Sequence, residues 1–304
     1  MKVRGERECR ECGTHWSYYE TGSIECPACG SVRSVGLDER TTHTDTPVEL
    51  DLSDHRSRFG EARETLPDDH VEKLKGDLRE YTRRRGFIRA GELLPLDPVY
   101  LAARELLETV DVYDRLRDPT DIERKYLLSL LGGVTDGVRP PAADVPESVR
   151  EARGMAAVHS VEAYRSDLLS FLDEQPFFRE QESDETSNDA APNRSSAPNK
   201  PAAPNKTSNN ATRTGSKAEN DDFSQIAESN SDTGAPREDL ARDAIEQLRD
   251  RTKLVEALGG DVSPGEADAL VDAADAIGEF VRDGEHAALT RARDELAKVS
   301  NRDS

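Results

Sequence analysis

Four cysteines within the first thirty residues carry the clearest chemistry of this 304-residue chain, and they are its only cysteines. They form two Cys-x-x-Cys pairs, Cys9 with Cys12 and Cys26 with Cys29, and thirteen residues separate the pairs. The two thiolates of one such turn can bind the same metal ion, and two facing turns complete a tetrahedral shell of four sulfurs. No fifth ligand and no open coordination position is indicated. The pattern therefore predicts a closed structural site for one Zn²⁺ and points to no reaction.

A small β module over residues 1–40 is expected to position these cysteines. Thr14–Tyr19 is rich in aromatic and β-branched residues, which favours a short strand. Gly13 and Gly30 each follow a cysteine pair, where a positive φ is often needed to aim amides at the sulfurs. So small a core depends on the ion, because metal binding supplies most of its folding free energy. The apolar cover expected beside the metal consists of Trp16, Tyr18 and Ile24.

The two cysteine motifs resemble the zinc ribbon of transcription factor B type. The residues that carry the resemblance are Cys9-Arg10-Glu11-Cys12-Gly13 and Cys26-Pro27-Ala28-Cys29-Gly30. The whole chain is similar to an uncharacterised haloarchaeal family of zinc-ribbon-containing proteins, which implies zinc at the four cysteines and no known activity. In transcription factor B the ribbon docks on RNA polymerase, and two cyclin-like helical repeats follow it. The helical middle of this chain is too short for two such repeats, so the role in transcription initiation does not carry over.

The same four thiolates leave the identity of the metal open. Rubredoxin-like iron proteins use closely similar cysteine motifs, and four sulfurs bind iron or zinc in nearly the same geometry. The chain has no Glu-x-x-His motif of a di-iron centre and therefore no obvious electron acceptor, which favours zinc. A metal-free disulfide pairing is the least favoured interpretation for a chain without an export signal.

The composition is strongly acidic. The chain carries 41 Lys plus Arg against 62 Asp plus Glu, a formal charge of −21, and its basic residues are 32 Arg and nine Lys. Acidity with scarce Lys and 5% aromatic residues is typical of a halophilic protein, whose surface stays soluble in molar salt. An ordinary acidic bacterial protein is the alternative. Residues 1–40 hold six basic and seven acidic groups, which indicates an acidic or polyanionic partner or, equally well, merely a small ligand-rich module.

The sequence also bears on location. No stretch approaches the roughly eighteen apolar residues that a membrane span needs. The N-terminus MKVRGERECR has no apolar core, so a secretory signal is not expected. We therefore expect a cytoplasmic protein without membrane contact.

Beyond the ribbon, the chain is expected to be mainly α. A helical bundle is predicted over residues 45–180, with a disordered linker rich in Ser, Asn, Ala and Pro over 181–235. Residues 236–304 are predicted to form a helical hairpin or a three-helix tail, alone or docked on the bundle. Helix starts are predicted from capping residues and prolines at Pro67-Asp68, Asp97-Pro98, Thr120 with Glu123, Pro146, and Ser263 with Glu266.

The only dense basic cluster consists of Arg79, Arg83, Arg84, Arg85 and Arg89. With Phe87 as a stacking ring, these arginines could contact the phosphates and bases of a nucleic acid. The alternative is structural, because cations at a helix C-terminus complement the helix dipole and need no ligand. High salt favours the structural interpretation, since phosphate affinity falls steeply as ionic strength rises.

No catalytic pattern stands out in the sequence. The six histidines share no metal-binding spacing, and nucleophile-elbow, phosphate-loop and dinucleotide motifs are absent. We therefore expect a non-enzymatic zinc-binding adaptor without a small-molecule substrate, whose ribbon docks on a protein partner of the transcription or translation apparatus. The alternatives are a rubredoxin-like iron redox carrier and direct nucleic-acid binding through the ribbon and the Arg83–Arg85 cluster. The residues expected to contact the partner are His15, Tyr19 and Glu20.

Overall fold

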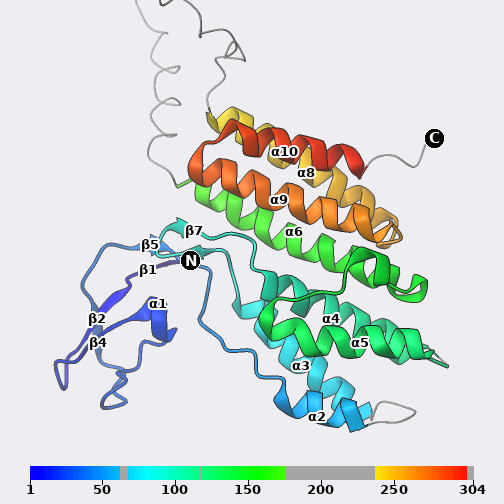
Figure 1. The fold of residues 1–304 in the computed structure, drawn as a ribbon. Helices are drawn as coiled ribbons and strands as arrows, with labels where there is room; N and C mark the ends of the chain where they lie inside the picture. Colours follow the sequence, from blue (N-terminus) through cyan, green and yellow to red (C-terminus); the bar gives the residue numbers. More distant parts are fainter. Residues whose placement is uncertain (62–67, 117, 175–236, 300–304) are drawn as a thin grey trace, which may run out of the picture. The chain divides into compact units, whose positions relative to one another are not determined.

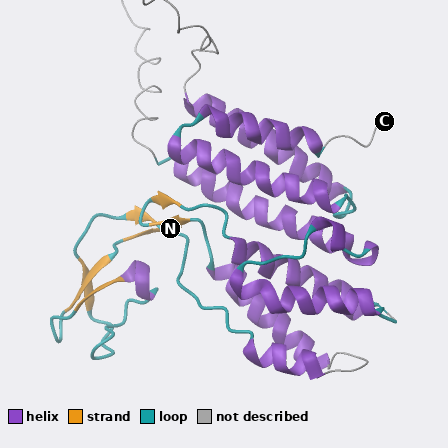
Figure 2. Ribbon diagram, viewed as in Figure 1, coloured by secondary structure: helices purple, strands orange, loops and turns teal. Residues whose placement is uncertain are grey.

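The fold is mainly helical, as expected, and its strands are short. The structure, a computed structural model, describes residues 1–61, 68–116, 118–174 and 237–299. Within these ranges, every strand lies in the first 93 residues. Figure 2 shows that helices make up most of the described fold. The linker predicted over 181–235 lies outside the described residues. None of the helices in the described ranges is long and apolar enough to cross a membrane.

The N-terminal region contains a three-stranded antiparallel sheet with β2 at its centre and β3 and β4 at its edges. Arg7 of β2 faces both Trp16 of β3 and Gly36 of β4. Strand β1 pairs instead with β5, so a second small ladder brings the chain start next to the residues that lead out of the module. The elements are β1 (Lys2–Val3), β2 (Glu6–Cys9), β3 (His15–Ser17), the single-turn helix α1 (Tyr18–Thr21), β4 (Ser34–Gly36) and β5 (Thr41–Thr42).

A first group of helices packs around one apolar cluster. Helix α4 contacts α3 and α5, and α2 packs against α5. The largest fully buried side chains here are Phe59 and several leucines, among them Leu106 and Leu130. The elements are α2 (Ser53–Glu61), α3 (Asp68–Arg84), β6 (Ile88–Arg89), β7 (Glu92–Leu93), α4 (Pro98–Arg115), α5 (Asp121–Gly133), and the 3₁₀ turns η1 (Val134–Asp136), η2 (Ala142–Asp144) and η3 (Glu147–Val149).

A second group consists of four long helices that run side by side (Figure 1). These are α6 (Arg150–Leu172), α8 (Arg237–Ala257), α9 (Pro264–Asp283) and α10 (His286–Lys298). Helix α6 contacts both α8 and α9, and α10 covers α9. The three-helix tail predicted after residue 236 is therefore present, and its helices share an apolar cluster with α6. The domain limits expected from the sequence remain a prediction.

Several helices start at the capping residues from which the sequence predicts their starts. Asp97 accepts a hydrogen bond from the Val99 amide with Pro98 as the first residue of α4. Complete capping boxes start α5 at Thr120 and α9 at Ser263. The start predicted at Pro146 differs slightly. Pro146 has an extended ψ of 145° and precedes the 3₁₀ turn η3, so α6 starts only at Arg150.

A buried ionic cluster joins the two helical groups. Glu105 of α4 is 0% exposed and accepts hydrogen bonds from Tyr126 and, at 3.0 Å each, from Arg139 and Arg153. Arg153 of α6 also binds both carboxylate oxygens of Asp268 on α9 at 2.8 Å. Each charge in the cluster has an opposite partner, which is the condition for burying charges without a large penalty.

Candidate metal centre

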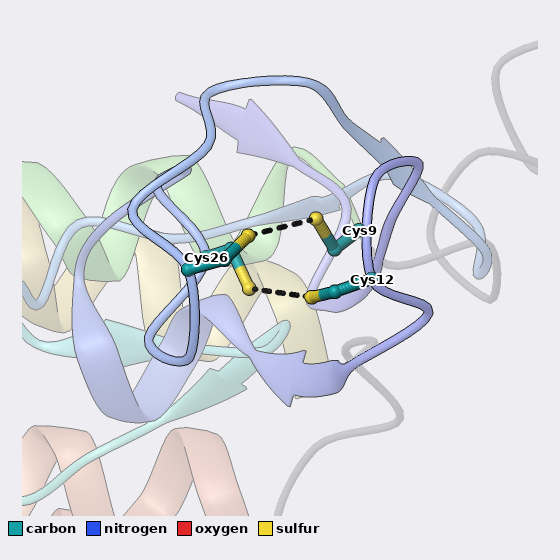
Figure 3. Close-up of side chains that lie close together, drawn as sticks. Cys9, Cys12 and Cys26 are labelled. Carbon is teal, nitrogen blue, oxygen red and sulfur yellow. Dashed lines mark hydrogen bonds between the residues drawn. The ribbon is translucent and has the colours of Figure 1, made fainter.

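The four cysteine sulfurs lie together in the folded chain. All four Sγ atoms are within 4.8 Å of one another. Between the two pairs, the Sγ atoms of Cys9 and Cys29 lie 3.6 Å apart and those of Cys12 and Cys26 lie 3.5 Å apart. Figure 3 shows the sulfurs of Cys9, Cys12 and Cys26 turned towards one another. Four sulfurs at about 2.3 Å from a central Zn²⁺ stand about 3.8 Å apart, and a disulfide needs about 2.05 Å. The donor set therefore fits a four-sulfur metal site.

The two cysteine turns repeat the same backbone hydrogen bonds. The amides of Cys9 and Cys26 donate to the carbonyls five residues on, at Thr14 and Ser31, each over 2.9 Å. The amides of Gly13 and Gly30 close each turn by donating to the first cysteine's carbonyl. Both glycines have a positive φ, 73° and 70°, as the sequence predicts.

Contacts between the two turns hold them at this separation. The Arg10 amide donates to the Arg33 carbonyl at 2.8 Å, and the Arg33 guanidinium pairs with Glu11 at 2.6 Å. The Ser34 hydroxyl donates to the Ile24 carbonyl and accepts from Arg7. Backbone and side-chain contacts between the two segments therefore contribute to bringing the sulfurs together.

Burial divides the four sulfurs into two kinds. Cys9 and Cys26, the first residue of each pair, are 1% and 2% exposed and form a small apolar cluster with Trp16. Cys12 and Cys29 are exposed, so one edge of the site faces solvent. Of the expected apolar cover, Trp16 is buried and its indole N–H donates to the Ser23 carbonyl. Ile24 is 50% exposed, so this part of the expectation is wrong.

Hydrogen bonds and neighbouring sulfurs shift the pKa values of the thiols in different directions. Hydrogen bonds from Thr14 lower the pKa of Cys12 to about 6. The pKa of Cys26 is also lowered, because backbone amides outweigh the opposing effect of burial. The Ser31 amide favours the thiolate of Cys29, but the sulfurs of Cys12 and Cys9 raise its pKa to about 12. A divalent cation at the centre would remove this repulsion and keep all four thiolates ionised.

The three residues expected to contact a partner have different environments. His15 and Glu20 are exposed. Tyr19 is half-buried, its hydroxyl lies 2.6 Å from the Thr41 hydroxyl, and its ring packs against buried His43 at 4.9 Å. Tyr19 thus contributes to the contact between the sheet and the outgoing chain, and contact of the three residues with a partner stays a prediction.

The arginine cluster is largely engaged within the fold. Arg83 and Arg84 pair with Glu80, and Arg85 and Arg89 both bind Asp45, which is 0% exposed. Arg79 is exposed on α3. The stacking role expected for Phe87 is wrong, because this ring is 2% exposed and packs edge-on against Tyr100 and Tyr164.

Sequence reasoning missed two features of these regions. Thr14 has its hydroxyl 3.2 Å from the Cys12 sulfur, and its place two residues after Cys12 is the only local signal. Asp45 forms ion pairs with Arg85 and Arg89, which follow α3 in the sequence. The partners lie about forty residues apart in the chain, so no local sequence pattern predicts these contacts.

Comparison with known proteins gives a family and no activity. The profile of a family of unknown function (DUF7117) matches residues 1–197 and residues 187–296. No curated protein and no solved structure matches the chain. A haloarchaeal origin and a ribbon of transcription factor B type therefore stay predictions. Since the two matched segments together extend from the cysteine turns to the last long helix, the chain belongs to the family of unknown function DUF7117.

Proposed function

We propose that residues 1–40 form a zinc ribbon in which Cys9, Cys12, Cys26 and Cys29 bind one Zn²⁺, and that the protein is a non-enzymatic adaptor. The observation that carries the proposal is the clustering of all four Sγ atoms within 4.8 Å. Four sulfurs fill a tetrahedral shell and leave no position for water or substrate, which is the mark of a structural site. The metal would hold the ribbon in a shape that a protein partner recognises.

The exposed edge of the ribbon supports the docking role. His15 and Glu20 are open to solvent, and Ile24, Val32 and Leu37 expose 50%, 61% and 49% of their surface. Exposed apolar side chains on so small a module favour contact with another macromolecule. The partner would belong to the transcription or translation apparatus.

Iron in the same four thiolates, as in a redox carrier, is the competing metal. The sulfur geometry accommodates either ion. The purified full-length protein should be colourless and contain one zinc by elemental analysis. A red protein with strong visible absorption and one iron would replace the adaptor proposal by the redox one.

Direct binding of nucleic acid is less well supported. Four of the five clustered arginines already contact carboxylates of the chain. Arg85 and Arg89 would have to leave the buried Asp45 before they could bind a phosphate.

The adaptor role is tested with a matched pair of full-length variants. Cys26→Ser removes a buried ligand, whereas Ser31→Ala keeps the carbonyl that pairs with the Cys26 amide. We expect Cys26→Ser to lose zinc and Ser31→Ala to keep it. Stoichiometric zinc in Cys26→Ser would overturn the site.

The partner is then sought by affinity capture from the source cell at its native salt, with and without nuclease. A protein retained by the wild type and by Ser31→Ala but lost with Cys26→Ser would support docking through the ribbon. Identical capture by all three would show that the ribbon has no docking role. Capture abolished by nuclease would favour nucleic acid.

A further inference from the structure

A cavity of about 290 Å³ opens beside the end of α3, and its lining includes none of the cysteines. Its wall combines residues from α3, the turn that follows it, α4 and α6. The polar groups that matter for its chemistry are Arg83, Arg85, Arg104, Ser166 and Asp167. Three guanidinium groups from different parts of the chain thus meet at one cavity in a protein of net charge −21.

Two of these arginines are already paired. Arg85 uses its terminal nitrogens on Asp45 and Asp97, at 2.8 and 3.0 Å, while its buried Nε has no hydrogen-bond partner. Arg83 pairs with Glu80, but its side chain is 75% exposed and can turn towards the cavity. An exposed pair of this kind contributes little to stability, so it is easily exchanged for another anion.

Arg104 is different, because no carboxylate in the described part of the chain pairs with it. Its Nε and Nη2 donate to the Tyr100 hydroxyl at 3.2 and 3.1 Å, and its guanidinium lies over that ring, 5.4 Å from the centroid. A phenol orients the guanidinium but does not neutralise it. The arginine is therefore held in place with its charge available.

Among the described residues, the carboxylate in the cavity wall is that of Asp167, and one of its two oxygens is engaged by other donors. Asp167 Oδ2 accepts hydrogen bonds from the Phe87 amide and the Thr44 hydroxyl, both at 2.7 Å. These donors stabilise its charge and fix the turn after α3. Asp167 thus shapes the cavity, and it forms no ion pair with Arg104.

We propose that this cavity binds a phosphate group, with Arg104 as its anchor, Arg83 closing over it and the exposed Ser166 hydroxyl as a further donor. A tetrahedral dianion accepts hydrogen bonds from several directions at once, which suits donors that converge from the three helices α3, α4 and α6. The volume admits inorganic phosphate or the phosphate of a small monoester. The inference is independent of the metal site and of the adaptor role.

The test titrates inorganic phosphate into the full-length protein at low chloride, with isothermal calorimetry and the Nε–H NMR signals of the arginines as readouts. Arg104→Gln should weaken binding about tenfold or more, because a charge-assisted bidentate contact is lost. Arg115→Gln is the control, since Arg115 lies exposed on the same helix and donates to its own helix backbone. Binding should also weaken as chloride rises.

A second variant covers the case in which Arg104→Gln disturbs α4. Ser166→Asp places a negative charge at the exposed rim and should abolish phosphate binding while the helical circular dichroism is kept. A nucleoside 5′-monophosphate that binds more tightly than inorganic phosphate would indicate a monoester ligand, and equal affinity would indicate free phosphate. No saturable binding by the wild type, or equal binding by wild type, Arg104→Gln and Ser166→Asp, would overturn the proposal.

Discussion

The cysteine module and the helical body are stabilised by different means. The module has an apolar cluster of only three residues, Cys9, Trp16 and Cys26. The helical body buries two extensive apolar clusters around α4 and around α6 and α9. Since the burial of apolar surface is the main favourable term in folding, only the helical body has enough of it to fold by burial alone. The module needs another source of free energy, and a metal bound by the four convergent sulfurs would supply it.

Metal removal should give the largest difference in response between the cysteine module and the helical body. Binding of a structural zinc contributes about 10–16 kcal/mol at neutral pH in small zinc modules, so chelation should unfold residues 1–40. The helices should remain, because their clusters contain no metal ligand in the described residues. The measurement is an NMR amide spectrum with and without chelator, beside far-UV circular dichroism. Unchanged module signals after complete metal loss would contradict this comparison.

The next largest effect is expected in the ionic cluster of the helical body. Glu105→Gln removes the buried charge that Arg139 and Arg153 share and leaves both arginines to Asp268. Loss of one partner from a buried ion network should destabilise the protein by about 4 kcal/mol, as measured by chemical denaturation.

The control for this prediction is an exposed ion pair of the same body. Glu246→Gln removes the partner of Arg249 at 3.6 Å, where Glu246 is 69% exposed. A change below about 0.5 kcal/mol is expected there. A comparable loss in both variants would mean that the buried cluster has no special part in joining the helical groups.

A cavity made in the apolar core should lower the free energy of unfolding slightly less than the loss of the Glu105 charge does. Ile277→Ala on α9 truncates a side chain that is 0% exposed, which should lower the free energy of unfolding by about 3 kcal/mol. Leu254→Ala on α8 is the counterpart, because Leu254 is 41% exposed and should change stability by less than about 1 kcal/mol. Both variants should bind metal like the wild type. If Ile277→Ala also released the metal, the two regions would depend on each other.

The smallest predicted effect concerns His43, which lies where the module leads into the helical body. His43 is 1% exposed, and both ring nitrogens lack a hydrogen-bond partner. Burial lowers the pKa of His43, and the positive charges of Arg89 and the amino terminus lower it further. The negative charge of Asp45 opposes this shift. The unfolded chain therefore binds the proton more readily, and stability should fall as pH drops below about 6.5, by at most about 1.4 kcal/mol per pH unit.

The matched variants for this prediction are His43→Phe and His15→Ala. Phenylalanine keeps a ring against Tyr18 and Tyr19 but cannot take up a proton. Unfolding curves between pH 5 and 7.5 should be less pH-dependent for His43→Phe than for the wild type. His15 is exposed, so His15→Ala should behave like the wild type. Equal pH dependence in all three proteins would exclude His43 as the titrating group.

The features that could be predicted from the sequence are those with local causes. A Cys-x-x-Cys-Gly turn is closed by backbone hydrogen bonds between residues at most five apart. The spacing alone therefore predicts the sulfur pairs and the positive φ of Gly13 and Gly30. Capping boxes act over three residues, so the starts of α5 and α9 could be predicted as well. The mainly α class follows from the helical spacing of apolar residues in the long segments.

Only the tertiary structure decided which residues meet over long distances. Tyr19 packs inward on Thr41 and His43, Phe87 is buried between two tyrosines, and Arg85 and Arg89 are bound by Asp45. The surroundings of Arg104 also could not be predicted from the sequence. The sequence does not distinguish it from the 31 other arginines, and only the fold places its guanidinium at the Tyr100 hydroxyl. The physical reason is that pairing and burial depend on contacts between elements, whereas turn and cap chemistry is contained within one short segment.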